Sequence, residues 1–245
     1  MKKLSTLILL TLFGFGCSNT PEDSMNPFFE DYDTPYQIPP FEKIKEAHYM
    51  PAFNQGMEEQ LDEIDVITNN PNSPTFENTI VELERTGKTL NKVADVFFNL
   101  LSSNTNDEMD TIAAEISPKL SAHSDAISLN NKLFNRVHEV FEKRNELGLN
   151  TEQLRLIEET HKGFIRSGVQ LDKSSMAKLT QINQELSSLS VQFDQNLLKE
   201  TNEGFSLVIE DEKQLDGLPE DFIDQSAKLA EENGHQGKWM FKPTR

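Results

Sequence analysis

The sequence predicts a mainly α fold, an antiparallel helical bundle with a small two-stranded β element near its C-terminus. Apolar residues recur at steps of three and four from Phe41 to about residue 203, which is the spacing of one face of an α-helix. The turns between these stretches are short, and short connections favour antiparallel neighbours. After Gly204 the pattern changes to the alternation that is typical of β-strands.

Several stretches of the predicted helical domain, residues 41–203, carry the apolar stripe of a single helix. The first runs from Phe76 to Leu101 as one long helix with Gly87 in its stripe, and Thr75 or a neighbour caps its start. Further helices are predicted over residues 109–127, 133–141, 154–165 and 179–197. The last one has a polar face rich in Gln, Asn and Ser, and its apolar face is formed by Leu179, Ile182, Leu186, Leu189, Phe193 and Leu197.

Residues 204–245 are predicted as a strand–helix–strand segment that is incomplete at its C-terminal end. Residues 205–209 alternate and include β-branched side chains, so we expect a strand there. A short helix follows over about 218–232, and a second strand over 237–241 could pair with the first. The sequence stops four residues after that strand, which favours a truncated chain.

The composition fits a soluble globular protein, because 36% of the residues are hydrophobic and 26% are charged. A net charge of −18 would repel a phosphate backbone, so no nucleic-acid partner is expected. Acidity of this kind is usually a solvated exterior, although it could also suit basic peptides.

The N-terminus is typical of an exported protein. Lys2 and Lys3 precede an apolar run from Leu4 to Phe15, which has the length of a signal-peptide core and is short for a membrane span. The sole cysteine, Cys17, follows this run and resembles the lipidated cysteine of a bacterial lipoprotein. We therefore predict a signal peptide over residues 1–17, lipidation at Cys17, and a membrane-anchored protein on the periplasmic side of the cell envelope. The alternative is an ordinary secretory signal, since Gly14 stands where lipoproteins usually have a large aliphatic residue.

Residues 18–40 contain five prolines among acidic and small polar residues, so they are predicted as a tether followed by an extended arm. Within this arm, the aromatic side chains of Phe28, Phe29 and Tyr36 are expected to pin it to the surface of the helical domain.

Two patterns come near to a metal-binding motif. His138-Glu139-Val140-Phe141-Glu142 would match H-E-x-x-H if Glu142 were a histidine. Val140 and Phe141 lie on the apolar stripe, however, which leaves His138 at its margin or in solvent, and no third ligand is evident.

The second pattern, Glu158-x-x-His161, has the spacing found in di-metal helix bundles, but such sites need two copies and further glutamates. A hydrogen-bonded core histidine is the favoured interpretation of His161. His48, His123 and His235 show no metal-ligand spacing, and no nucleophile motif or phosphate-binding glycine loop occurs. No catalytic, cofactor-binding or metal-binding residue is therefore assigned in this chain.

Long phrases of the sequence resemble a known protein family. Between Asn26 and Ala122, and shortly after, they read NPFF, PPFEKIKEAHYMPAF, SPTFENTIVELERTGKTL, VFFNLLSSNTNDEMDTIAAEISPKLSAHSDAI and LNNKLFNRV. They resemble the N-terminal part of the zinc metallopeptidases that include peptidyl-dipeptidase Dcp, oligopeptidase A and thimet oligopeptidase, and the resemblance extends to Phe241. The Dcp-type branch is the most similar, and its members release C-terminal dipeptides.

The resemblance implies one helical half of a two-lobed, monomeric peptidase whose channel admits short peptides. Zinc is the cofactor of the full-length family, held by an H-E-x-x-H motif, and that motif is absent from these 245 residues. The chain alone is therefore expected to be inactive, an N-terminal scaffold fragment of an exported enzyme. The alternatives are a non-catalytic helical envelope lipoprotein that binds peptides or a protein partner, and a helical metal-binding bundle.

Overall fold

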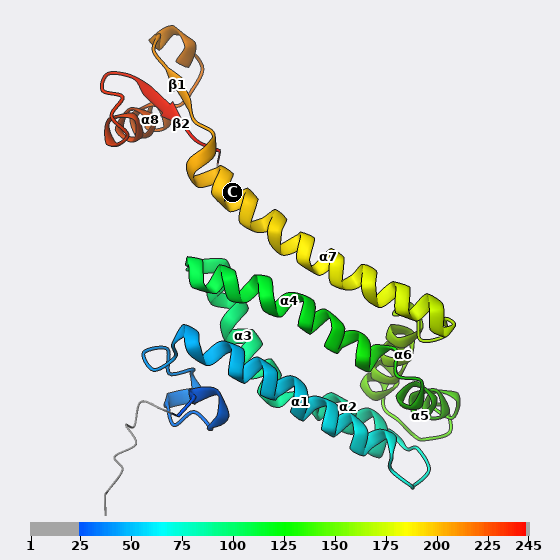
Figure 1. Cartoon of the computed structure of the whole chain (residues 1–245). Helices are drawn as coiled ribbons and strands as arrows, with labels where there is room; N and C mark the ends of the chain where they lie inside the picture. The colour runs from blue at the N-terminus through cyan, green and yellow to red at the C-terminus, as the bar shows by residue number, and fades with distance from the viewer. Residues whose placement is uncertain (1–24, 244–245) are drawn as a thin grey trace, which may run out of the picture.

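The computed structural model describes residues 25–243, and helices make up most of this part of the chain (Figure 1). The longer helices are α1 (Tyr49–Thr68), α3 (Lys88–Ser103), α4 (Asp107–Ser128), α5 (Asn131–Glu142), α6 (Thr151–Arg166), α7 (Lys173–Lys199) and α8 (Glu220–Glu232). Shorter helical segments are η2 (Pro27–Phe29), η3 (Pro35–Gln37), η4 (Glu46–His48), η5 (Phe76–Val81), α2 (Glu82–Arg85), η6 (Glu200–Gly204) and η7 (Glu212–Leu215). The predicted mainly α fold with a small β element is confirmed.

The β element is a two-stranded antiparallel sheet of β1 (Leu207–Ile209) and β2 (Trp239–Phe241), in which Val208 pairs with Met240. Helix α8 connects the strands and packs on β2, where the rings of Phe222 and Phe241 lie 5.6 Å apart. This small unit lies beyond the C-terminal end of α7, away from the helical bundle (Figure 1).

A first hydrophobic cluster holds α1, α3 and α4 together. Its centre is aromatic: the Phe97 ring lies 5.0 Å from Tyr49 and 5.4 Å from Phe53, both edge-on. Edge-to-face pairs of this kind add to the stabilisation from burial. The buried members of the cluster are Phe28, Tyr49, Ala52, Phe53, Leu90, Val93, Val96, Phe97, Met109, Ile112, Ala113 and Ile116.

The N-terminal arm contributes one residue to this cluster. Phe28 is 1% exposed, and its ring lies 5.6 Å from Tyr49, so it pins the arm as predicted. The side-chain amide of Asn26 also donates to the His48 carbonyl at 2.8 Å. The same prediction was wrong for Tyr36, whose ring is 96% exposed in a turn with a left-handed φ of 59°. Phe29 is 39% exposed, so its side chain is only partly covered.

The stretch predicted as one helix over residues 76–101 is interrupted at Gly87. Thr86 is extended and Gly87 has a φ of 76°, so α2 ends and α3 begins there. The Glu63 carboxylate of α1 accepts the Gly87 amide at 2.7 Å, and a Cβ at this position would lie 2.5 Å from the Gln60 side chain. The apolar spacing continues across the break, which is why periodicity alone predicted a continuous helix.

A second hydrophobic cluster joins the far end of α1 to η5, α5 and α6. Its buried members are Ile64, Ile67, Phe76, Ile80, Leu133, Phe134, Val137, Val140, Ile157, Phe164 and Val169. With the first cluster, it gives the bundle two adjoining cores that share α1.

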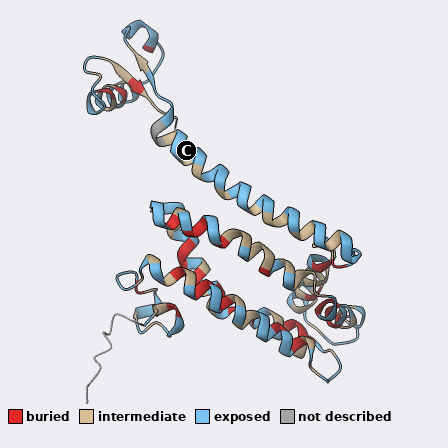
Figure 2. Ribbon diagram, viewed as in Figure 1, coloured by how far each residue is buried: buried red, intermediate tan, exposed pale blue. Residues whose placement is uncertain are grey.

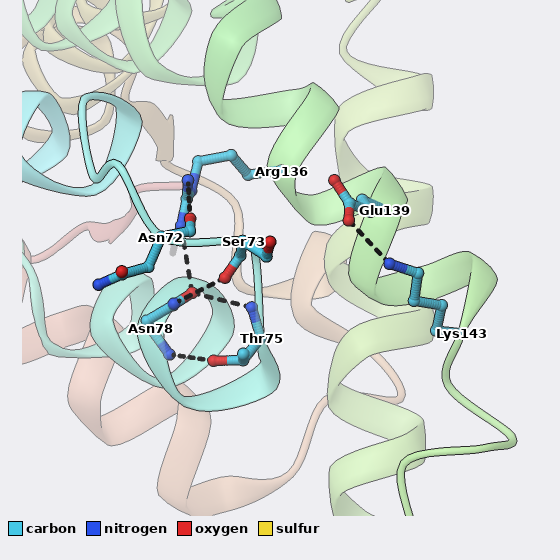
Figure 3. Close-up of polar contacts among 7 residues, drawn as sticks. All are labelled: Asn72, Ser73, Thr75, Asn78, Arg136, Glu139 and Lys143. Atoms are coloured by element: carbon cyan, nitrogen blue, oxygen red, sulfur yellow. Dashed lines mark hydrogen bonds and ion pairs between the residues drawn. The ribbon is translucent and has the colours of Figure 1, made fainter.

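Beside the second cluster, a buried arginine fixes the loop between α1 and η5 (Figure 3). The guanidinium of Arg136 on α5 donates to the carbonyls of Asn70 and Asn72, at 3.0 and 3.2 Å, and to Oδ1 of Asn78 at 3.1 Å. Asn78 and Thr75 form the reciprocal hydrogen bonds of a capping box, as expected for the cap at Thr75. The loop therefore depends on one cation from a neighbouring helix.

No helix within residues 25–243 is both long enough and apolar enough to cross a membrane.

Candidate functional site

The near-motif on α5 lies at the edge of the second cluster. Val140 is buried, whereas His138 and Glu142 are exposed, as the apolar stripe indicated. Glu139, which stands where the motif would have its general base, pairs with Lys143 at 2.8 Å (Figure 3). This part of α5 presents a solvated polar face.

The structure brings together the two histidine patterns that were considered separately in the sequence. Nδ1 of His138 on α5 lies 3.0 Å from Nε2 of His161 on α6. The His161 ring stacks on Phe141, with centroids 3.9 Å apart and planes 4° from parallel. His161 is thus hydrogen-bonded, as expected, but it is half-buried at the margin of the core. One imidazole must donate and the other accept, so at least the accepting ring is neutral when this bond is formed.

The surroundings of His161 favour its uncharged imidazole. Burial lowers the pKa of His161, and the neighbouring His138 lowers it further. The Glu142 carboxylate raises this pKa, and the Arg144 guanidinium lowers it. Arg144 also stacks on the Phe141 ring, with 3.9 Å from its central carbon to the ring centroid, and lies 3.5 Å from Glu158.

These groups do not fit the zinc site that the resemblance implies for the full-length family. A zinc ion needs three protein ligands in a catalytic site, all with free lone pairs. One nitrogen of His138 and one of His161 are taken up by their mutual hydrogen bond, and Glu158 lies beside Arg144. Within residues 25–243, no three His, Cys, Asp or Glu side chains are placed to hold a metal ion.

A further histidine, His123 on α4, is buried between the two clusters. Its Nε2 lies 2.7 Å from Oε1 of Gln60, and the Gln60 amide nitrogen donates to Thr86 at 3.2 Å. Burial lowers the pKa of His123, which favours the neutral ring that donates to Gln60. The three residues form a chain that links α1, α4 and the break before α3. A cavity of about 430 Å³ adjoins it, lined in part by Leu83, Leu120 and Phe164.

The other histidines have structural surroundings. Nδ1 of His48 accepts the backbone amide of Lys45 at 3.0 Å and so closes the turn that precedes α1. His235 lies in the connection between α8 and β2, where its amide bonds to the Ala230 carbonyl at 2.8 Å. Cys17, the predicted lipidation site, lies outside the described residues.

Helix α7 exposes a row of large apolar side chains to solvent. It lies along α4 at the edge of the bundle (Figure 1), and none of its residues is buried (Figure 2). Five large apolar side chains of α7 face solvent, with exposed fractions between 42% and 65%. These five residues, the α7 stripe, are Ile182, Leu186, Leu189, Phe193 and Leu197.

The side of α7 that meets the bundle is mixed, with Val191 packed against the first cluster and two amide side chains bonded to α4. The Asn183 amide donates to both oxygens of Asp125 on α4, at 2.9 and 3.2 Å. The Gln195 amide donates to the Asp110 carbonyl at 2.8 Å. Sequence reasoning found the two faces of α7, but it did not identify Asn183 and Gln195 as contact residues. Their spacing gave no signal, because twelve residues are about three and a third turns of an α-helix and do not return to the same side.

Comparison with known proteins identifies relatives along most of the chain, although no protein-family model matches it. The chain is 40% identical over 217 residues to the dipeptidyl carboxypeptidase of Escherichia coli, covering 89% of this chain and 32% of that protein. The Salmonella typhimurium dipeptidyl carboxypeptidase is 38% identical with the same coverage. The oligopeptidase A of Haemophilus influenzae is 28% identical over 200 residues, covering 82% of this chain and 29% of the relative. The chain thus spans about a third of the length of the curated relatives that it matches. The resemblance expected from the sequence is confirmed.

Proposed function

We propose that this chain, related along most of its length to one part of the dipeptidyl carboxypeptidases and oligopeptidases A, is the helical scaffold of a zinc peptidase that cleaves short peptides. The observation that carries the proposal is the 40% identity to a dipeptidyl carboxypeptidase over 89% of the chain. The reaction would release dipeptides from peptide C-termini. The scaffold would form part of the wall of the channel that admits the peptide.

Under this proposal the chain supplies no catalytic group. The sequence contains no H-E-x-x-H motif, and the histidine of its nearest approach, His138, is hydrogen-bonded to His161 on another helix. Zinc, the general base and the donors that stabilise the tetrahedral intermediate would come from polypeptide that corresponds to the remaining two thirds of the relatives. The contribution of this chain is to shape the space in which a peptide is held.

A second candidate function is a non-catalytic envelope lipoprotein that binds peptides or a protein partner. The solvent-facing α7 stripe supports it, because contiguous exposed apolar surface often marks a binding face. The two candidates differ in what they require. The scaffold needs a catalytic polypeptide for its function, whereas a binding lipoprotein acts as a single chain.

Export and lipidation at Cys17 are part of both candidates. The charged start, the apolar run and the sole cysteine support them. Expression in a bacterium with radiolabelled palmitate should label the chain, and the label should be lost in Cys17→Ser. An unlabelled protein recovered in the soluble periplasmic fraction would instead indicate an ordinary secretory signal.

The scaffold proposal is tested with the purified chain and blocked tetrapeptides as substrates, with dipeptide release followed by mass spectrometry. The chain alone should release no dipeptide, with or without added zinc. The chain mixed with the remaining two thirds of the Escherichia coli dipeptidyl carboxypeptidase should release dipeptides, and a chelator should stop the reaction. In the control mixture the motif glutamate of the added polypeptide is replaced by glutamine. Zinc-dependent hydrolysis by this chain alone, or no gain on mixing, would contradict the proposal.

A further inference from the structure

The α7 stripe is a surface that the described chain leaves uncovered. Its residues recur at steps of four, three, four and four, so they form one continuous band along a 27-residue helix. We propose that this band is the docking surface for the polypeptide that corresponds to the two thirds of the relatives lying outside the aligned region. The inference rests on the proposed function and names the surface through which scaffold and catalytic polypeptide associate.

The orientation of α7 is the first support. A helix on the surface of a protein normally turns its apolar face to the core and its polar face to water. Here Asn183 and Gln195 face the bundle together with Val191, which packs on the first cluster. Leu189 and Phe193, in contrast, are 53% and 65% exposed. Exposure of such a band to water is unfavourable in free energy, because burial of apolar surface is the dominant favourable term in association. The helix is therefore oriented for a second apolar surface on its outer side.

The seam between α7 and α4 is the second support. A hollow of about 560 Å³ lies between the two helices, lined by serines together with Phe98, Leu120 and Leu186. Phe98 on α3 is itself 39% exposed. Because Leu186 belongs both to the hollow and to the stripe, the apolar band continues into a concave surface. Such a surface can receive large side chains from a partner.

The length of the relatives identifies this occupant. The chain aligns with 32% of the Escherichia coli relative, so that protein has two thirds of its length available to cover the corresponding surface. A second copy is disfavoured because each chain carries a net charge of −18, and two such chains repel each other. An anionic membrane is disfavoured for the same reason, and membrane-surface helices are typically rich in Lys and Arg.

The test measures binding between this chain and the remaining two thirds of the Escherichia coli dipeptidyl carboxypeptidase. Leu186→Glu and Phe193→Glu place a charge on the stripe, where it should disrupt the association. Ser188→Glu and Gln192→Glu place the same charge on exposed positions of α7 off the stripe. Isothermal titration calorimetry should give a Kd at least about tenfold weaker for the stripe variants, with the controls within about twofold of the wild type. Circular dichroism and urea unfolding establish that all four variants and the Escherichia coli polypeptide fold before binding is measured.

Four results of these experiments would each overturn the proposal. These results are no binding by the wild-type chain, equal weakening by stripe and control variants, a stripe-dependent homodimer in light scattering, or stripe-dependent binding to phosphatidylglycerol vesicles. The outcome is separable from that of the proposed function. Stripe-dependent binding without peptide hydrolysis would support the docking surface and contradict the scaffold function. Peptide hydrolysis that is unaffected by the stripe variants would support the scaffold function and contradict the docking surface.

Discussion

Nδ1 of His138 and Nε2 of His161 lie 3.0 Å apart, so a hydrogen bond between two imidazoles joins α5 to α6. Protonation of both rings would remove the acceptor and place two like charges in contact. The pair therefore ties the packing of these two helices to pH.

We expect the free energy of unfolding to fall as the pH is lowered through the range below 6.5. The folded-state pKa values of His161 and His123 are both depressed, so the unfolded chain binds more protons there and stability is lost on acidification. Urea unfolding between pH 8 and 5 measures this slope. His161→Gln should reduce it, whereas the neighbouring variant Lys162→Gln, which keeps both histidines, should retain it. An equal slope in His161→Gln and the wild type would show that the histidine pair does not contribute to the pH dependence of stability.

Gly56 should tolerate no side chain. A Cβ on Gly56 of α1 would lie 2.7 Å from the backbone nitrogen of Leu90 and 2.8 Å from its Cα, so α1 and α3 would have to separate. Gly56→Ala is expected to destabilise the chain by about 1–3 kcal/mol in urea unfolding. Gly163→Ala on α6 is the matched control, because a Cβ there meets nothing within 4 Å. It should stabilise by about 0.5–1 kcal/mol, and destabilisation of similar size in both would contradict the argument.

Arg136 should be required for the order of the loop at residues 69–75. Arg136→Met removes the three hydrogen bonds of the guanidinium. The residue is buried, with 8% of its surface exposed. The loss should be about 2–3 kcal/mol, since hydrogen bonds to charged groups are among the stronger ones. Arg155→Gln is the control, because its pair with Glu159 is exposed and should contribute little to stability. Faster proteolysis within the loop of Arg136→Met would accompany the effect, and an unchanged rate would argue against it.

The aromatic residues of the arm should differ sharply in importance. Phe28→Ala leaves a cavity in the first cluster and should cost about 3–5 kcal/mol. Tyr36→Ala removes a ring that is 96% exposed and should change stability by less than about 0.5 kcal/mol. Thermal unfolding followed by circular dichroism distinguishes the two. A comparable loss in both variants would mean that the ring of Tyr36 has a partner after all.

The sequence predicts most of the elements but fewer of the relationships between them. Apolar spacing located most of the helices after residue 76, and alternation located the strands near residues 207 and 240, because both patterns report local burial. Helix α1 was not delimited in the sequence, although both hydrophobic clusters share it. The break at Gly87 could not be read from spacing, since it depends on Glu63 and Gln60 of another helix.

The candidate site shows the same limit. The patterns at His138 and His161 were visible separately, but their hydrogen bond depends on how α5 meets α6. On α7, periodicity defined two faces and could not determine which one the bundle takes. The side that meets the bundle carries Val191, which packs on the first cluster, and two amides that bond to Asp125 and to the Asp110 carbonyl, both far away in the sequence.

Burial of Phe28 also limits how far the folded protein could stand from a membrane. Phe28 is fixed in the first cluster, and about eleven residues separate it from Cys17. A chain of that length reaches at most about 40 Å even when fully extended. If Cys17 carries the proposed lipid, the bundle would lie close to the bilayer surface, and under the proposed function peptides would have to reach it from the layer next to the headgroups.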